Sequence, residues 1–224
     1  MVPVSADLQQ SNNVTGLPHG LMPPYLVLRD FLDEETVTGL LDYAVSRQSD
    51  FTPTQLGSNS GVDPSVRIRI SMGLGDLGKF RRVFKGKILN LLPTLTAQLR
   101  VSQIDEPKLV TDLVVHGDGA FYKRHVDTRP AHRQDMEGIR ILTCVYYFNA
   151  EPKAFTGGAL RLHAIGGKEG EHFVDIEPAR NSLAVFLAWA PHEVLPISCP
   201  SKKFIDSRFS INCWMHGKKP GTSA

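Results

Sequence analysis

The sequence predicts a mostly β protein: a jelly-roll barrel of the double-stranded β-helix type, with packed helices on its N-terminal side. From residue 109 onward, short apolar segments are separated by turns rich in Gly, Pro and Asp, which is typical of antiparallel strands rather than of a parallel sheet. Eight such strands are expected, at 109–116, 121–127, 139–148, 158–164, 172–176, 182–188, 192–197 and 207–216.

The part before residue 109 mixes short strands with helices. Residues 25–30 are expected to form a strand, and a helix should follow from Asp33, because its first turn is acidic and apolar residues then recur with the helical period. Residues 66–72 alternate as a strand would. Residues 80–99 suit a helix in two pieces, since Pro93 lies in its middle.

These elements define three expected parts of one domain. Residues 1–23, rich in Ser, Asn, Gly and Pro, are predicted to be a flexible entry segment. Residues 24–108 are predicted to be a helical and mixed support region, and residues 109–218 the barrel that carries the catalytic site. A chain of 224 residues is long enough for one such domain with a sizeable core.

Composition excludes several classes of function. The formal net charge is +2, with 25 basic residues against 23 acidic ones, so a nucleic-acid-binding role is not expected. No apolar run is long enough for a membrane span, and the polar start of the chain does not resemble a signal peptide. The three cysteines are scattered and odd in number, which predicts free thiols and a cytoplasmic location.

The most informative pattern is His125-Val-Asp127 followed at a distance by His192. Residues i and i+2 of a strand point to the same face, so His125 and Asp127 can reach one metal while a distant strand supplies the third ligand. Two imidazoles and one carboxylate form the facial triad of mononuclear non-haem iron sites, which leaves open positions for a chelating keto acid and for dioxygen.

Other histidines compete for these positions. His116-Gly-Asp118 has the same spacing, but Asp118-Gly119 is a turn signal, so that pair should straddle a bend. His163 and His172 are alternative distal ligands. Neither is followed by a suitably placed Arg-x-Ser, so surface or structural roles are favoured for both, as they are for His132 and His216.

Arg208-Phe-Ser210 follows the distal histidine. The planar guanidinium fork of arginine suits a carboxylate, as a dicarboxylate co-substrate requires. Together with the triad, this pattern predicts an oxygenase that depends on Fe(II) and 2-oxoglutarate.

Several blocks resemble one known family in order and spacing. The stretch from about 118 to 214 is similar to the prolyl 4-hydroxylase-like branch of the Fe(II)/2-oxoglutarate oxygenases, especially to the oxygen-sensing prolyl hydroxylases and their bacterial relatives. The blocks are Gly119-Ala-Phe-Tyr-Lys-Arg-His125-Val-Asp127, Arg140-Ile-Leu-Thr-Cys-Val-Tyr-Tyr147-Phe-Asn149, Gly157-Gly-Ala-Leu-Arg-Leu162, Asp175-Ile-Glu-Pro178, Pro191-His-Glu-Val-Leu-Pro196 and Arg208-Phe-Ser-Ile-Asn-Cys-Trp214.

The resemblance implies roles for individual residues. His125, Asp127 and His192 match the catalytic iron ligands, and Arg208 matches the residue that pairs with the distal carboxylate of 2-oxoglutarate. A tyrosine whose hydroxyl joins that carboxylate is matched by Tyr147. The same comparison assigns Ser210 to the Arg-x-Ser pattern and Trp214 to an aromatic beside the iron carboxylate; from the residues alone, core packing is the simpler reading of Tyr147 and Trp214.

Two departures from the family concern the co-substrate pocket. Relatives commonly carry Tyr where this chain has His116. The gap between His192 and Arg208 is also longer than usual, which leaves Lys202 and Lys203 as alternative cations.

The resemblance further implies hydroxylation of an unactivated C–H bond with Fe(II), 2-oxoglutarate and O2, with ascorbate as a reductant in vitro. A prolyl residue in a protein or peptide is the favoured substrate; a free amino acid or a natural-product intermediate is the alternative. Residues 128–138 should overhang the site, where Arg129 and Arg133, with Arg161, could receive a carboxylate or an acidic peptide.

Other classes stay open beside the oxygenase. A cupin-like barrel could bind a metal without redox chemistry, although it has no need of a dicarboxylate clamp. An interaction domain with a decayed site is disfavoured by the intact ligand set, and an iron halogenase by the carboxylate at Asp127. The oligomeric state is left open by the sequence.

Overall fold

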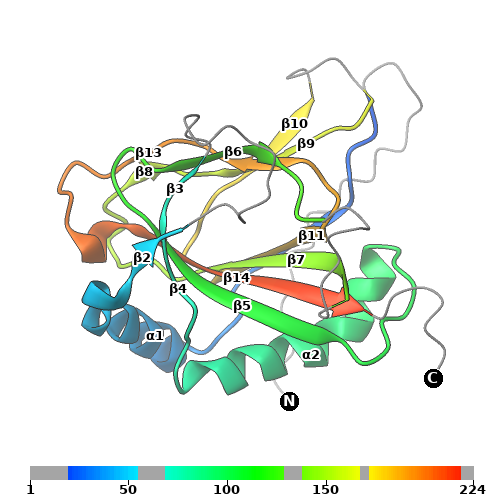
Figure 1. Cartoon of the computed structure of the whole chain (residues 1–224), viewed down its shortest axis with the longest axis horizontal. Coiled ribbons are helices and arrows are strands. Elements are labelled where there is room, and N and C mark those ends of the chain that lie inside the picture. The colour runs from blue at the N-terminus through cyan, green and yellow to red at the C-terminus, as the bar shows by residue number, and fades with distance from the viewer. Residues whose placement is uncertain (1–19, 55–68, 129–137, 167–171, 218–224) are drawn as a thin grey trace.

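The computed structural model describes residues 20–54, 69–128, 138–166 and 172–217. Two antiparallel sheets face each other, and both helices lie under the outer face of the larger one (Figure 1). The larger sheet has the strand order β1-β11-β7-β14-β5-β4-β2, and the smaller sheet the order β10-β9-β12-β6-β3; a short third sheet pairs β13 with β8. This arrangement confirms the predicted mostly β fold with packed helices.

The strands agree closely with the segments that the sequence predicts. Their bounds are β1 Tyr25–Leu28, β2 Thr52–Pro53, β3 Arg69–Ile70, β4 Met72–Leu74, β5 Lys108–His116, β6 Phe121–His125, β7 Ile139–Tyr147, β8 Thr156–Gly157, β9 Leu160–His163, β10 Phe173–Ile176, β11 Ser182–Leu187, β12 His192–Val194, β13 Ile197–Ser198 and β14 Arg208–Gly217. The predicted strand at 192–197 is interrupted, because its end forms β13, which pairs with β8; β8 precedes the predicted strand at 158–164, and β9 lies within that strand.

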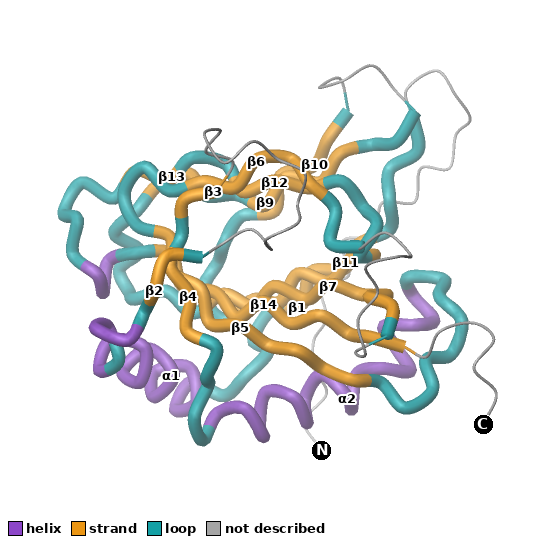
Figure 2. Tube along the Cα trace, viewed as in Figure 1, coloured by secondary structure: helices purple, strands orange, loops and turns teal. Residues whose placement is uncertain are grey.

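Helix α1 (Glu34–Ser46) begins where the acidic residues indicated. Asp33 accepts a hydrogen bond from the Thr36 backbone amide at 2.8 Å and so satisfies one of the unpaired donors at the helix N-terminus. The apolar face of α1 is buried against the larger sheet (Figure 2).

Helix α2 (Phe80–Gln98) corrects one prediction, because it continues through Pro93 as a single helix. Pro93 lies on the exposed face. Because proline has no N–H, the Leu89 carbonyl lacks its usual donor within the helix. Water can hydrate this carbonyl on the exposed face at modest cost. The helix is anchored on the opposite face by buried Phe84, Ile88 and Leu95.

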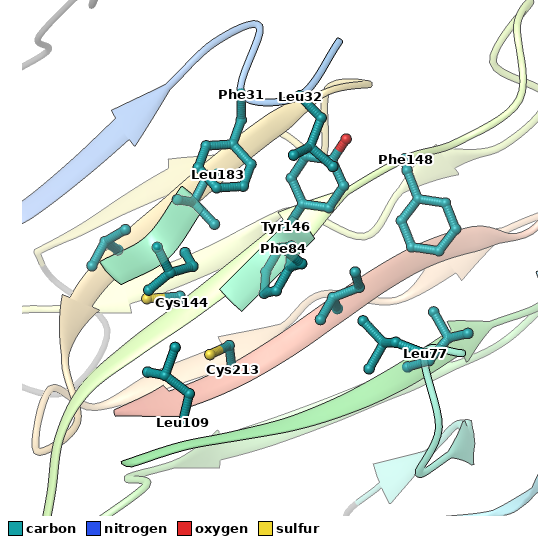
Figure 3. Close-up of a cluster of buried hydrophobic side chains, with 14 of the residues drawn as sticks. Phe31, Leu32, Leu77, Phe84, Leu109, Cys144, Tyr146, Phe148, Leu183 and Cys213 are labelled. Atoms are coloured by element: carbon teal, nitrogen blue, oxygen red, sulfur yellow. The ribbon is translucent and has the colours of Figure 1, made fainter. Parts of the chain in front are cut away.

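Successive side chains of a strand point to opposite faces, so the side chains of the larger sheet belong to two separate buried clusters. One set packs against the helices, and there Cys144 on β7 lies directly opposite Cys213 on β14, among Phe31, Phe84 and Tyr146 (Figure 3). The alternating set points between the two sheets, where Val145 and Tyr147 meet Leu160 and Leu162 of β9. The interior of the barrel is therefore a compartment separate from the helix-covered core.

Neither helix in the described ranges has the length and hydropathy of a membrane-spanning segment.

Burial makes two of the cysteines poor nucleophiles. It raises the pKa of Cys213 to about 12 and moves the pKa of Cys144 in the same direction. Because the thiolate is the reactive form, we expect neither to react with iodoacetamide at pH 8 in the folded protein. Mass spectrometry of the labelled peptides should show modification of both only after denaturation, and stoichiometric labelling of the native protein would contradict the buried placement.

Candidate metal centre

Three predicted ligands meet at the mouth of the barrel. One ligand atom from each of His125, Asp127 and His192 lies within 4.8 Å of the others. The Asp127 carboxylate is 3.9 Å from His125 Nε2 through Oδ1 and 3.7 Å from His192 Nε2 through Oδ2. These separations are those of atoms that surround a common point without bonding to one another, as metal ligands do.

Strand pairing explains how the two histidines meet. His125 ends β6, and its Cα partner across the β6–β12 ladder is His192. Their rings are 4.1 Å apart, with Tyr122 stacked on His125 and Phe186 against His192. Aromatic packing on each outer side restricts the rotation of both imidazoles.

Backbone carbonyls fix the protonation pattern of the two imidazoles. Nδ1 of His125 lies 2.8 Å from the Lys123 carbonyl oxygen, and Nδ1 of His192 lies 2.9 Å from that of Ala190. A carbonyl oxygen only accepts, so each Nδ1 carries the hydrogen and donates it. In the neutral ring each Nε2 then has a lone pair for a metal, in the arrangement by which proteins orient histidine ligands.

Asp127 reaches the site by a different route from the one predicted. The strand β6 ends at His125 rather than continuing to 127. Asp127 and Thr128 instead donate their backbone amides to the Ala188 carbonyl oxygen, at 2.8 and 3.1 Å. Asp127 therefore faces His192 because its backbone is bonded to the turn that leads into β12.

Two donors occupy one oxygen of this carboxylate. Asp127 Oδ2 accepts hydrogen bonds from Thr143 Oγ1 at 2.7 Å and from Trp214 Nε1 at 2.9 Å. Burial by itself would raise the pKa of Asp127, but the positive charge that His192 and His125 carry when protonated, together with these two hydrogen bonds, outweighs it, so the pKa is lowered. The carboxylate is thus held ionised, with Oδ1 outside this pair of hydrogen bonds.

Thr143 was not singled out by the sequence. It lies on β7, directly across the ladder from Trp214 on β14, and both side chains point into the barrel. The sequence did contain a signal for Thr143: it is separated from Tyr147 by an even number of positions on one strand, so both side chains lie on the interior face.

The second half of the site is a buried arginine. Arg208 is 1% exposed, its Nε donates to the Gly158 carbonyl oxygen at 2.9 Å, and its guanidinium lies over the Tyr147 ring at 4.8 Å. Gly158 has a φ of +71°, and a Cβ there would stand 2.8 Å from Arg208 Cδ. Only glycine therefore allows this close approach of the backbone to the arginine.

Three buried polar groups around Arg208 form no hydrogen bond of normal geometry among the described residues: Arg208 Nη2, the Tyr147 hydroxyl and Ser210 Oγ. Ser210 is the Cα partner of Tyr147 across the β14–β7 ladder, and it shares a strand face with Arg208. Burial raises the pKa of Tyr147, only partly offset by Arg208, so its hydroxyl keeps its proton. The cluster can donate several hydrogen bonds to one anion.

The other predicted candidates lie away from this cluster. His163 Nε2 donates to the Glu193 carboxylate at 3.0 Å, and Arg161 forms a bidentate ion pair with Asp175, at 2.7 and 2.8 Å. Asp118 accepts the Cys199 amide instead of facing His116. The alternative cations Lys202 and Lys203 are exposed.

Residues 129–137, with Arg129, His132 and Arg133, lie outside the described residues.

Comparison with known proteins agrees with this geometry. Residues 111–216 match the family model described as the 2OG-Fe(II) oxygenase superfamily, a span that contains the triad, Tyr147, Arg208 and Trp214. This segment is therefore similar to the domains of that superfamily. Enzymes of this superfamily use Fe(II), 2-oxoglutarate and O2, and the donor set of this segment suits them: two imidazoles, one carboxylate and a buried cation.

Individual relatives extend the match. The chain is 29% identical over 199 residues to an uncharacterised PKHD-type hydroxylase of Synechocystis sp.. The aligned region covers 87% of this chain and 63% of that protein. The chain thus spans less than two thirds of that relative's length.

Solved structures share the fold of the domain. A prolyl-4-hydroxylase of Pseudomonas putida superposes with a TM-score of 0.61 at 22% identity, over 90% of this chain and 94% of the other. A Trichoplax adhaerens prolyl hydroxylase in complex with a hypoxia inducible factor peptide fragment gives a TM-score of 0.62 at 22% identity, over 86% and 83%.

We expect Thr143→Val and Trp214→Phe each to weaken metal binding by about 10- to 100-fold, because each removes one hydrogen bond that orients Asp127. Competition with a fluorescent chelator, using Mn²⁺ or Fe²⁺ without oxygen, measures the affinity directly. Thr111→Val is the matched control, since Thr111 is the Cα partner of Cys213 and its side chain belongs to the opposite face of the sheet. Equal affinities for all of these proteins would contradict the orienting role.

Proposed function

We propose that this protein is an Fe(II)- and 2-oxoglutarate-dependent dioxygenase that hydroxylates an unactivated C–H bond, with a prolyl residue of a protein or peptide as its substrate. His125, Asp127 and His192 would hold the iron, while Arg208, Tyr147 and Ser210 would bind the distal carboxylate of 2-oxoglutarate.

The observation that carries this proposal is the unpaired charge of Arg208. No described carboxylate pairs with its guanidinium, although the side chain is buried. An uncompensated buried charge costs several kcal/mol, on the order of 3–5 when a partner is removed from a buried pair. A fold that keeps such a cation requires an anion from outside, and the unpartnered donors around it suit a carboxylate.

The residues of the site divide the work of catalysis. The bound metal, with 2-oxoglutarate and dioxygen, supplies the oxidation: the keto acid is converted to succinate and carbon dioxide, and one oxygen atom enters the substrate C–H bond. The protein's part is to hold the ligand set rigid through Thr143, Trp214 and the backbone carbonyls. Arg208 orients the co-substrate, and the apolar barrel interior around Val145, Leu160 and Leu162 excludes water.

The proposal of a prolyl substrate is supported by the relatives. Both solved structures named above are described as prolyl hydroxylases, and one holds a peptide. The indole of Trp214 lies beside Asp127, to which its Nε1 donates a hydrogen bond, and Arg140 lies over its ring at 4.4 Å.

Succinate release tests the reaction. We expect the purified protein with Fe(II), ascorbate and air to convert 2-oxoglutarate to succinate, and His192→Ala or Asp127→Ala to reduce the rate by at least about 100-fold, because each opens the triad. His163→Gln is the matched control, since that histidine faces Glu193 instead of the triad. Failure of the anaerobic iron form to bind 2-oxoglutarate would overturn the proposal in favour of a cupin-like metal protein.

Substrate class is tested separately. We expect proline-containing peptides, offered as a library, to gain one oxygen atom on proline as read by tandem mass spectrometry, and to increase succinate release. Free proline and other free amino acids form the comparison set. Hydroxylation confined to the free amino acids would replace the peptide substrate with a small-molecule one and leave the reaction class intact.

A further inference from the structure

His116 lies against the buried arginine. It is the last residue of β5, it is 2% exposed, and its Cα partner across the β5–β14 ladder is Arg208. His116 Nδ1 is 3.3 Å from Arg208 Nη1. The side chain is thus part of the arginine's immediate surroundings, outside the set of residues assigned above.

The chemistry of the contact determines the state of the imidazole. A guanidinium has only donors, so Arg208 Nη1 donates and His116 Nδ1 accepts. A ring that accepts at Nδ1 is neutral and carries its hydrogen on Nε2. A histidine can therefore take this place without adding a second cation to a buried site.

Three contacts together determine the direction of the guanidinium. Nε is bonded to the Gly158 carbonyl oxygen, Nη1 to His116, and the guanidinium lies over the Tyr147 ring. The ring packs against the guanidinium, and the two hydrogen bonds restrict its rotation. Nη2 is the nitrogen left without a partner among the described residues, so it is the corner that these contacts present to a ligand.

We propose that His116 is a positioning residue for Arg208, and that through Arg208 it gives the site its preference for a keto acid with a distal carboxylate over a shorter monocarboxylate. The inference rests on the proposed function, since it concerns the same co-substrate. With an apolar residue at position 116, Nη1 loses its acceptor and only one hydrogen bond would hold the guanidinium. The group could then rotate, and the energy of its bond to the distal carboxylate would fall.

Two substitutions separate the hydrogen bond from the volume of the side chain. In His116→Asn, the amide oxygen lies near the former position of Nδ1 and can accept from Nη1. His116→Leu keeps a side chain of comparable bulk and removes the acceptor. The probes are 2-oxoglutarate and 2-oxobutyrate, because the second has the keto acid end and lacks the distal carboxylate.

Binding is measured without oxygen, on the Fe(II)-loaded full chain, by the visible charge-transfer band that a chelating keto acid produces. We expect His116→Leu to weaken 2-oxoglutarate binding by about 10- to 100-fold, as loss of a hydrogen bond to a charged group does. Binding of 2-oxobutyrate should stay within about twofold, and His116→Asn should restore 2-oxoglutarate binding to within about threefold of the wild type. Calorimetry on the Mn²⁺ form provides a second readout that needs no iron spectrum.

Each outcome decides a question. An unchanged affinity of His116→Leu for 2-oxoglutarate would overturn the positioning role. An equal loss of affinity for both keto acids would overturn it as well, because it would show general damage to the pocket. A wild-type protein that binds neither keto acid would overturn the proposed function itself, and this inference with it. Should the leucine variant not fold, His116→Met makes the same test, because its side chain fills the space and its thioether is only a weak acceptor.

Discussion

The placement of strand β14 between β5 and β7 is the constraint on which the rest of the structure depends. Both neighbours are antiparallel to it over nearly its full length. Paired residues of the three strands therefore point to the same face of the sheet, and the face alternates from one residue to the next. Phe209, Ile211 and Cys213 enter the core under the helices. The alternate residues enter the barrel, where Arg208, Ser210 and Trp214 form one row of the site.

This arrangement couples stability to chemistry. The face that packs on α1 and α2 contains no charged side chain of β14, and its burial supplies the hydrophobic free energy that keeps the sheet rigid. The opposite face then tolerates groups that are costly to bury, such as the unpaired Arg208 and the hydroxyls of Tyr147 and Ser210. Functional sites are where proteins accept such local costs, because the ligand provides the missing partner.

The candidate metal-binding half and the candidate anion-binding half of the site, called the metal half and the anion half, are built by different means. At the metal half, backbone carbonyls and two side-chain donors determine which atom of each ligand faces the centre. At the anion half, one arginine is held by a carbonyl, an imidazole and an aromatic face. β7 and β14 connect the halves, since Thr143 and Trp214 serve the first and Tyr147 and Arg208 the second. A shift of either strand by one residue would dismantle both halves together.

The sequence by itself predicted the fold class, most of the strands, and His125, Asp127, His192 and Arg208 as candidate site residues, because period-two alternation and the order of His, Asp and Arg can be read along the chain. It could not show that Pro93 stays within a helix, since that depends on which face is exposed. Nor could it show that Asp127 is held by Ala188, or that Thr143 donates to Asp127 and His116 accepts from Arg208. Those contacts join residues far apart in the chain, so only the register of the sheets decides them.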